Sequence, residues 1–425
     1  MDARQRTRSC CREAGSRDSH GDVSRGVRQI CVPMDRETYD RIWSDAGKVR
    51  ELLNELIRVS PELFPAEIAE GFALTGHLPE SKKMPGIRLR QLRLHTGGVF
   101  TLRPSFVLSY MTGNVEELEH PLLLLSIGVP CWVVTHIFGR DDMFWQRHLE
   151  RLGRNSLVGT TVRNAERLPE HLAADEHHVD WCGQKGYVAV TAGGGCLLGM
   201  ALTSSADEAH LTAAYGRFAD EARDVKPDYT PKTVNTDGWF ATRNAFRALF
   251  ATIATILCFL HGFLKIRDRC RKARDLHQHI WDVYRAETAG DFRTRMAAFQ
   301  KWFDTGTWPA AVREMVSKLC HRESEYAESY SHPGCHRTSN LVDRLMNRLT
   351  RLAYAGRGLH GHQQTSELRL RGWALLQNFR PFAPRSNRRR DHQSPAHRLH
   401  GKQYHPHWLH NLQISASLGG YRCCT

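Results

Sequence analysis

Length, composition and charge limit what this chain can be. Its 425 residues exceed the roughly 100 to 200 that one hydrophobic core serves, so we expect two or three domains. Apolar residues make up 41% and charged residues 24%, which excludes a wholly disordered or fibrous protein. Lysine and arginine outnumber aspartate and glutamate by 59 to 45, a net charge of +14, so the composition favours a polyanionic partner such as nucleic acid.

The N-terminal end and the cysteines indicate a reducing, cytoplasmic setting. The stretch "MDARQRTRSCCREAG" has no apolar run of the kind found in a secretory signal, and residues 1–33 are expected to form a disordered basic arm. The longest apolar run, 249–264, is shorter than the roughly 20 residues that span a bilayer, so no membrane partner is expected. The twelve cysteines include no Cys-x-x-Cys and do not predict a disulfide framework.

Residues 34–165 are expected to form a mainly helical DNA-binding region. The stretch "DRETYDRIWSDAGKVRELLNELIRV" repeats apolar residues at helical spacing and predicts one long amphipathic helix that Pro61 ends. The stretch "GIRLRQLRLHTGGVFTLRPSFVL" alternates apolar and basic residues around Gly97-Gly98. This alternation predicts a two-stranded ribbon with a tight turn.

Three short helical patterns, broken at Gly128 and Gly139, have the spacing of a helix-turn-helix within about 116–153. Pro130 falls in the first turn of the second helix, where its missing N–H is tolerated. In such a unit one helix lies in the major groove while neighbouring cations bind phosphates. The residues expected to contact DNA are Arg140, Gln146, Arg147 and Arg151. Similar trios of helices occur in proteins that do not bind DNA, and that alternative stays open.

From His171 onward the apolar period becomes that of strands. The runs "HLAADEHHVDW", "GYVAVTAGGG" and "CLLGMALT" are separated by glycine turns and predict a three-stranded meander. A helix, a fourth strand "KTVNTD", a second helix "ATRNAFRALF" and a fifth strand "TILCF" follow. This order is that of a ribonuclease H-like fold, so we expect an α/β catalytic domain of this type over 166–385.

Two aspartates follow small or apolar residues of the predicted strands. Asp175 comes after "LAA" at the end of the first strand, and Asp237 comes after "VNT" at the end of the fourth. These two strands are neighbours in a ribonuclease H-like sheet, so the carboxylates are expected to meet at its rim. Mg²⁺ (or Mn²⁺) prefers such oxygen ligands, and phosphodiester chemistry uses a pair of these ions. An isolated aspartate after a strand is more often a turn or helix cap.

The stretch after Asp237 carries the most specific motif of the chain. It contains Asp237-Gly-Trp, an apolar strand, the pair Cys258-x-x-His261 and the basic helix start "FLKIRDRC". Together these features resemble insertion-sequence transposases of the Mutator-like type, over roughly 173–384. The resemblance implies a ribonuclease H-like domain with an acidic triad and a helical insertion at about 273–337. It also implies a nucleoid-associated protein of prokaryotic type, acting as a homodimer on terminal inverted repeats and target DNA.

The third acid departs from the pattern of the family. The stretch "TSNLVDRLMNRL" is similar to the Thr-x-Asn-x-x-Glu-Arg helix of the family, with Asp343 at the position of the glutamate. An aspartate is one methylene shorter, so its helix must approach the metal ions more closely. Glu367 is the alternative third acid. Weaker alternatives lie in a charged run, namely Glu323, Glu325 and Glu328.

The Cys258 and His261 pair is weak evidence for zinc, because a structural zinc site usually takes four ligands. We expect Cys258 to end a buried strand and His261 to begin the next helix near the acids, where it binds a carboxylate or a substrate phosphate. The helix that follows is expected to lie along a DNA strand through Lys265, Arg267 and Arg269.

These features predict a DNA transposase that hydrolyses strands at element ends and then joins the freed 3′-hydroxyl to target DNA. One alternative is a catalytically inactive, transposase-derived protein that only binds specific DNA. A metal-dependent nuclease without strand transfer is a further alternative. Residues 386–425 are expected to form a basic extension, partly folded, with "WLHNLQISAS" as a short packed element.

Overall fold

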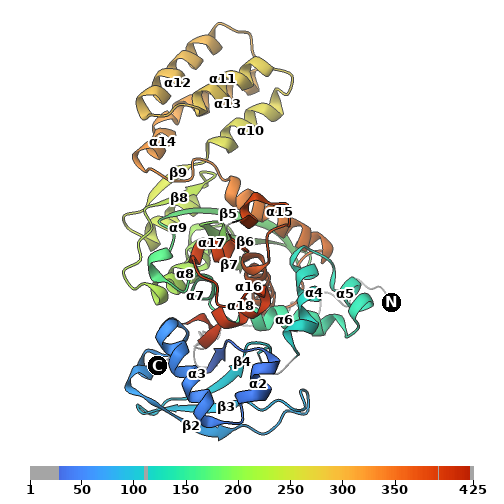
Figure 1. The fold of residues 1–425 in the computed structure, drawn as a ribbon. Helices are drawn as coiled ribbons and strands as arrows, with labels where there is room; N and C mark the ends of the chain where they lie inside the picture. The colour runs from blue at the N-terminus through green and yellow to red at the C-terminus, as the bar shows by residue number, and fades with distance from the viewer. Residues whose placement is uncertain (1–27, 110–112, 391, 422–425) are drawn as a thin grey trace, which may run out of the picture.

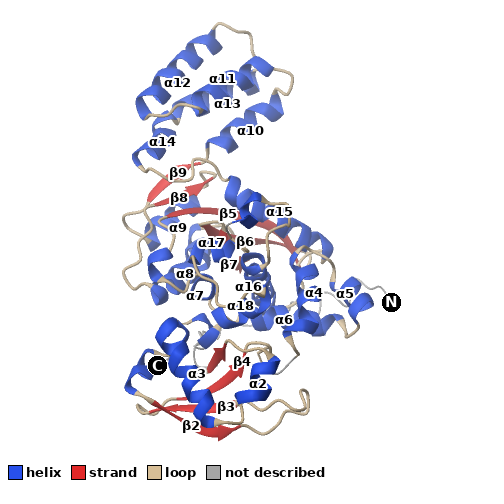
Figure 2. Ribbon diagram, in the orientation of Figure 1, coloured by secondary structure: helices blue, strands red, loops and turns tan. Residues whose placement is uncertain are grey.

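A computed structural model describes residues 28–109, 113–390 and 392–421, and it is a mixed α/β protein, as predicted. Figure 1 shows an N-terminal sheet domain, a central sheet covered by helices, and a helical lobe at the far end. Figure 2 shows that strands are confined to the first two parts. Residues 1–27 of the predicted basic arm lie outside the described residues.

The N-terminal domain is a four-stranded sheet covered by two helices. In spatial order the strands are β1 (Gln29–Val32), β4 (Val99–Pro104), β3 (Arg90–Leu94) and β2 (Phe72–His77). The helices are α2 (Arg36–Ile42) and α3 (Ala46–Val59). Strands β3 and β4 form the predicted ribbon, and Gly97 takes the positive φ of +110° that its turn requires.

Three features of this domain correct the expectations from sequence. Strand β1 lies inside the segment expected to be a disordered arm, and the start of the 34–165 region is built on a sheet. The single long helix is divided, because the Asp45 side chain accepts hydrogen bonds from the N–H groups of Gly47 and Lys48 and thereby caps a new helix.

The three helices expected at 116–153 are α4 (Val115–Ser126), α5 (Cys131–Phe138) and α6 (Asp142–Gly153). Gly128 and Gly139, which separate them, both have positive φ. Helix α6 packs closely on α16 (Gln363–Phe379): a Cβ added at Gly153 would lie only 1.8 Å from the Leu368 carbonyl oxygen. One side of the third helix is therefore buried in the protein.

The central sheet has five strands in the order β7-β6-β5-β8-β9. They are β5 (His171–Trp181), β6 (Gln184–Gly193), β7 (Cys196–Thr203), β8 (Thr233–Thr236) and β9 (Ala254–Leu257). Strands β5, β6 and β7 are antiparallel, whereas β5, β8 and β9 are parallel. All five lie where the apolar runs predict them, and the fourth strand neighbours the first.

Alternating side chains of β5 enter two separate cores. Ala173 and Val179 pack with α4, α6, α15 (Asn340–Ala355) and α16 on one face. Leu172 and Ala174 face the other core. The helices of that second face are α7 (Leu157–Thr161), α8 (Glu208–Val225) and α9 (Phe240–Leu249). The sheet is therefore the middle layer of an α/β/α sandwich.

The helical lobe has its own apolar core. Its helices are α10 (Phe259–Arg269), α11 (Arg274–Tyr284), α12 (Ala289–Asp304), α13 (Ala310–His321) and α14 (Glu323–Ala327). Helices α11 to α14 occupy the stretch 273–337 expected as an insertion. Trp281, Trp302 and Trp308 pack against this core, so their bulk serves mainly to hold the lobe together.

The C-terminal segment is not an appendage. Helix α17 (Pro395–His400) is followed by α18 (Trp408–Ser415), which is buried and is the packed element predicted from "WLHNLQISAS". Beyond α18, Ser417 Oγ accepts a hydrogen bond from the Cys31 N–H at 3.1 Å and donates one to the Leu63 carbonyl. The end of the chain thus completes the core of the N-terminal domain.

Short 3₁₀ turns complete the described elements. They are η2 (Pro61–Leu63), η3 (Ala66–Glu70), η4 (Ala165–Arg167), η5 (Glu328–Ser331), η6 (Asn387–Arg390) and η7 (Ser417–Gly420). Within the described ranges, no helix combines the length and the apolar character needed to cross a bilayer.

Candidate active site

Asp175, Asp237 and Cys258 occupy equivalent register positions in or directly after three neighbouring strands of the parallel half of the central sheet. In the strand register, Ala173 pairs with Asn235, and Thr236 pairs with Leu257. Asp175 and Asp237 each lie two residues beyond the first pair, and Cys258 lies one residue beyond Leu257. Side chains in register on parallel strands point to the same face, and neighbouring strands lie about 4.8 Å apart. The two predicted acids therefore share one face and one edge of the sheet.

Asp175 lies within β5 and not at its end, which corrects the expectation from sequence. Strand β5 has eleven residues, whereas β8 has four and ends after Thr236. Past Ala173, strand β5 no longer pairs with β8; it pairs with β6 and, at its far end, forms an isolated bridge between Trp181 and Leu359. The carboxylate of Asp175 reaches a rim because its neighbour β8 stops there.

Helix α15 begins beside these residues and brings Asp343 with it. Ser339, its N-cap residue, donates its backbone N–H to Cys258 Sγ at 3.1 Å and its hydroxyl to Asp343 Oδ2 at 2.7 Å. The Cys258 thiol in turn donates to Ser339 Oγ at 3.2 Å, and His261 Nδ1 lies 3.3 Å from the same oxygen. Cys258, His261, Ser339 and Asp343 form one hydrogen-bonded group, which we call the Cys-His-Ser-Asp cluster.

The register of β5 against α15 relates Asp343 to the other acids. His177 Nε2 lies 3.4 Å from Thr350 Oγ1, so the odd-numbered side chains of β5 face α15. Asp175 is about 7 Å before His177 along the strand, and Asp343 is about 10 Å before Thr350 along the helix. Charge interactions agree with this placement, because the negative charges of both Asp343 and Asp175 raise the pKa of His261. The three predicted acids and His261 lie in one region.

Crowded negative charge shifts the protonation of this region. Burial, together with the neighbouring carboxylates of Glu176 and Asp237, raises the pKa of Asp175 to about 7. A hydrogen bond with Cys258 and the negative charges of Cys258, Asp343 and Asp175 raise the pKa of His261 to about 9. At neutral pH, His261 is therefore protonated, and the Asp175 carboxyl is partly protonated unless a cation binds beside it.

Cys258 itself is under opposing influences. Burial acts to raise the pKa of its thiol, but hydrogen bonds from His261 and Ser339 prevail and hold the pKa below its ordinary value. Cys258 and His261 therefore each favour the charged form of the other. Cys258 and His261 thus lie where the sequence predicts, at the end of a buried strand and the start of the next helix.

Glu176 was not singled out from the sequence, although it directly follows Asp175. As adjacent strand residues, the two point to opposite faces. The Glu176 carboxylate accepts hydrogen bonds from the Tyr215 and Thr242 hydroxyls, and burial raises its pKa. Its role is electrostatic: its charge contributes to the raised pKa of Asp175. The adjacent acids in "AADEH" were the available signal.

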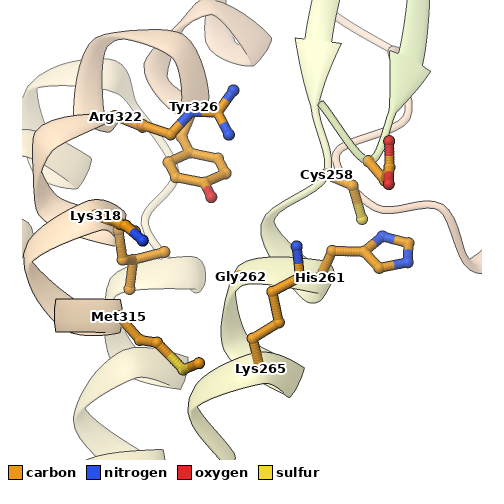
Figure 3. A pocket seen from close by; sticks show the side chains of 10 residues that line it. Cys258, His261, Gly262, Lys265, Met315, Lys318, Arg322 and Tyr326 are labelled. Carbon is orange, nitrogen blue, oxygen red and sulfur yellow. The ribbon is translucent and has the colours of Figure 1, made fainter. Parts of the chain in front are cut away.

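A pocket of about 170 Å³ lies between the sheet edge and the helical lobe. Figure 3 shows Cys258, His261 and Lys265 on one wall and Lys318, Arg322 and Tyr326 on the other. Asp237 also lines it. The sequence did not point to Lys318 or Arg322, because nothing in their helices identifies the sheet edge that they approach.

Glu367, the alternative third acid, lies elsewhere. It is buried on α16, where its carboxylate accepts the Leu202 N–H at 3.1 Å and forms an ion pair with Arg217. Leu202 is on β7, two strands and about 10 Å from β5. Glu367 is therefore excluded from the group of acids. Glu325, one of the weaker alternatives, instead accepts hydrogen bonds from Arg243 and Arg322.

The predicted DNA-contacting residues fall on two separate elements. Lys265, Arg267 and Arg269 are exposed on α10, where Arg267 also pairs with Asp268 at 3.4 Å. Near α6, Arg140 and Arg147 are exposed, whereas Gln146 and Arg151 are partly buried. The exposed cations leave both elements free to meet a polyanion.

The donors at the sheet edge fit a hard divalent cation, although they do not form a closed cage. Among the described residues, no three His, Cys, Asp or Glu side chains converge as metal ligands. Mg²⁺ needs no such cage, because it is commonly held by one or two carboxylates, waters and substrate phosphates. The negative charges of Glu176 and Asp237 help to raise the pKa of Asp175, which marks a negative site that a cation would relieve.

The chain matches no protein-family model, and no curated protein sequence is significantly similar to it. The geometry of the site therefore carries the functional argument.

Proposed function

We propose that this chain is a DNA transposase that cleaves strands at element ends and transfers them to target DNA. The observation that carries the proposal is the placement of Asp175 and Asp237 on neighbouring parallel strands, on one face and at one rim. The strand order β7-β6-β5-β8-β9 supports the finer assignment to a ribonuclease H-like domain, in which such a rim holds catalytic carboxylates.

In this proposal Asp175 and Asp237 hold Mg²⁺ or Mn²⁺, and Asp343 adds the third carboxylate. The bound ions supply charge neutralisation and activation of the attacking oxygen at a phosphodiester. Ser339 ties Asp343 to the strand that ends at Cys258, which supports an aspartate at this position because the helix start itself is drawn to the sheet. The shorter side chain is thereby compensated.

His261 acts in this proposal as a phosphate-binding cation. Its imidazolium is favoured by Cys258 and the nearby acids, and it lines the same pocket as Asp237. Cys258 and Ser339 orient its ring through their hydrogen bonds. In the first reaction a water oxygen attacks phosphorus and the 3′-oxygen leaves. In the second, that 3′-hydroxyl attacks a target phosphodiester and displaces another 3′-oxygen.

The DNA contacts and assembly remain part of the proposal. Helices α4 to α6 serve as a helix-turn-helix, with Arg140 and Arg147 as its exposed cations, while Lys265, Arg267 and Arg269 of α10 bind the strand near the acids. We further propose a homodimer on the two element ends and a location at the nucleoid.

A second candidate function is specific DNA binding without catalysis. The observation that favours it is the absence, within the described residues, of three converging metal ligands. The Asp343 carboxylate also accepts the hydroxyl proton of its own helix cap. In this alternative the basic surfaces are used and the acids are not.

Cleavage of DNA carrying the flanking ends of the element separates the two functions. We expect the full chain to nick such DNA with Mg²⁺, and Asp237→Asn to lower the rate by about 10³-fold, because an electrostatic contact to the reacting phosphate is lost. Asp220→Asn, at an exposed acid of α8, is the matched control and keeps full activity. Activity that survives Asp237→Asn would overturn the mechanism, and an inactive wild type that binds these ends would favour the second candidate.

A further inference from the structure

Helix α15 carries a row of arginines on the side away from the sheet. Arg344, Arg348 and Arg351 follow one another at spacings of four and three residues, which places them on one face of the helix. The buried residues of α15 mark the opposite face, and they are Val342, Leu345, Met346 and Leu349. We call Arg344, Arg348 and Arg351 the α15 arginine row.

Two further arginines join this row from the segment after α16. Burial and the positive charges of Arg388, Arg351 and Arg344 lower the pKa of Arg348. Burial and the charge of Arg348 lower the pKa of Arg380 to about 10. None of these five side chains forms an ion pair with an acid in the described part of the chain. Like charges gathered without counter-charges mark a surface prepared for an anion.

The row connects the two parts of the molecule that the proposed function assigns to DNA. Its first member, Arg344, directly follows Asp343 on the same helix. Its last member, Arg351, lies against the turn between α4 and α5, because a Cβ added at Gly128 would be 3.4 Å from Arg351 Cβ. Figure 1 shows α15 running beside the sheet toward α4. Helices α4 to α6 are called the three-helix unit. A DNA backbone that reaches from this unit to the predicted acids would pass over the α15 arginine row.

The dimensions of the row suit a nucleic-acid strand. Seven residues of helix separate Arg344 from Arg351, a rise of about 10 Å. Each strand of duplex DNA carries one phosphate per 3.4 Å of axis, so about three phosphates fit this length. Asn347 lies between the arginines on the outer face, and the exposed Tyr354 follows Arg351 by three residues.

We propose that the α15 arginine row, extended by Arg380 and Arg388, binds the phosphate backbone of duplex DNA between the three-helix unit and the acids. The proposal rests on the proposed function, because it places the DNA of that same site. It assigns these arginines to positioning: phosphate contacts set the register of the duplex without reading its sequence.

The test measures binding in the absence of divalent cations, so it does not depend on catalysis. The triple variant Arg344→Gln, Arg348→Gln, Arg351→Gln is compared with wild type by fluorescence anisotropy of a random duplex of about three helical turns, in EDTA. We expect its affinity to fall on the order of 10²-fold at 0.1 M salt. We also expect the slope of log K against log salt to become shallower by about 2.7, at about 0.9 for each lost phosphate contact.

Two further variants separate charge from folding. The triple Lys82→Gln, Lys83→Gln, Lys301→Gln removes the same charge from exposed sites away from α15, and we expect less than about a threefold loss. The triple arginine-to-lysine variant of the row keeps the charge and should retain most of the affinity. Circular dichroism and thermal melting confirm that each variant is folded.

The outcomes distinguish this proposal from the proposed function. If the triple arginine-to-glutamine variant binds the duplex as tightly as the triple variant of Lys82, Lys83 and Lys301, the proposed role of the α15 arginine row is overturned, even where wild type still cleaves DNA. A wild type that binds anionic vesicles or single-stranded RNA but not duplex DNA also overturns it. A wild type that binds the duplex through the row but never cleaves supports this proposal and overturns catalysis.

Discussion

Acids lie beside both the parallel and the antiparallel half of the central sheet, but their surroundings differ. Beside the antiparallel half, Glu367 of α16 accepts the Leu202 N–H and pairs with Arg217. In the parallel half, the charge of Asp237 acts on Asp175, and His261 and Arg322 are neighbouring cations. The first acid is part of the packing, whereas the second pair needs an additional cation.

Strand length explains this difference. Strands β5, β6 and β7 have eleven, ten and eight residues and are covered by helices on both faces. Strands β8 and β9 have four residues each and end early, so the residues that follow them emerge at a rim. A carboxylate packed between a helix and long paired strands, as Glu367 of α16 is, must find a partner in the protein, because leaving it unpaired is costly. A carboxylate at the rim of the sheet can instead be neutralised by a cation that binds from solution.

The comparison is tested most directly by neutralising Asp343, beside the parallel half, and Glu367, beside the antiparallel half. We expect Asp343→Asn to lower Mg²⁺-dependent cleavage by about 10²- to 10³-fold, because an electrostatic group at the reacting phosphate is lost. We expect Glu367→Gln to leave the cleavage rate nearly unchanged, because Glu367 lies about 10 Å from β5. Single-turnover cleavage by the folded variants measures both, and equal losses would remove the distinction between the halves.

The parallel half was also the part of the site that the sequence predicted best. Glycine turns and alternating runs located all five strands, and the order of strands and helices correctly made the first and fourth neighbours. Cys258 and His261 were placed correctly because three residues of spacing at a strand-to-helix junction leave little freedom. The position of Asp175 within β5 was missed, because the point where β8 stops depends on tertiary packing and not on the residues of β5.

Other features depend on contacts that local patterns do not contain. Cys31 and Ser417 meet across 386 positions of sequence, so neither "QICV" nor the C-terminal segment revealed that they share a core. Lys318 and Arg322 reach the pocket only because the lobe folds back on the sheet edge. The break before α3 was predictable, since "SDAG" contains the aspartate that caps the helix.

The raised pKa of Asp175 gives a second, smaller distinction between the halves. A proton must leave Asp175 before it binds Mg²⁺, so we expect the affinity for Mg²⁺ to fall up to about tenfold per pH unit below pH 7. Without metal the sign for stability is opposite. A folded-state pKa of about 7, above the ordinary 3.8, stabilises the protein at low pH, and this contribution is lost as pH rises through 7.

Thermal melting from pH 5 to 8, with and without Mg²⁺, tests both the fall in Mg²⁺ affinity at low pH and the loss of stability at high pH without metal. Asp175→Asn should weaken the pH dependence between pH 5 and 6.5 and remove the stabilisation by Mg²⁺, whereas Glu367→Gln should keep both. His261 adds a pH dependence of its own above about pH 6.5, because its folded-state pKa of about 9 lies above the ordinary 6.5, so the range from pH 5 to 6.5 reports on Asp175. Wild type and Asp175→Asn with the same pH dependence would contradict the electrostatic account of the rim.

The smallest effect concerns two serines near the starts of the helices that lie beside the two halves. Ser339 precedes α15 and donates its hydroxyl to Asp343, while Ser366, in the first turn of α16, donates to the His360 carbonyl at 3.1 Å. A hydrogen bond to a charged group contributes about 1.5 kcal/mol, so we expect Ser339→Ala to lower cleavage about tenfold. Ser339→Thr should restore it, because threonine keeps the hydroxyl. Ser366→Ala, the matched control, should change stability slightly and cleavage not at all. Equal activity of both alanine variants would mean that Asp343 is held by its helix alone, and that the Cys-His-Ser-Asp cluster joins strand to helix without positioning the acid.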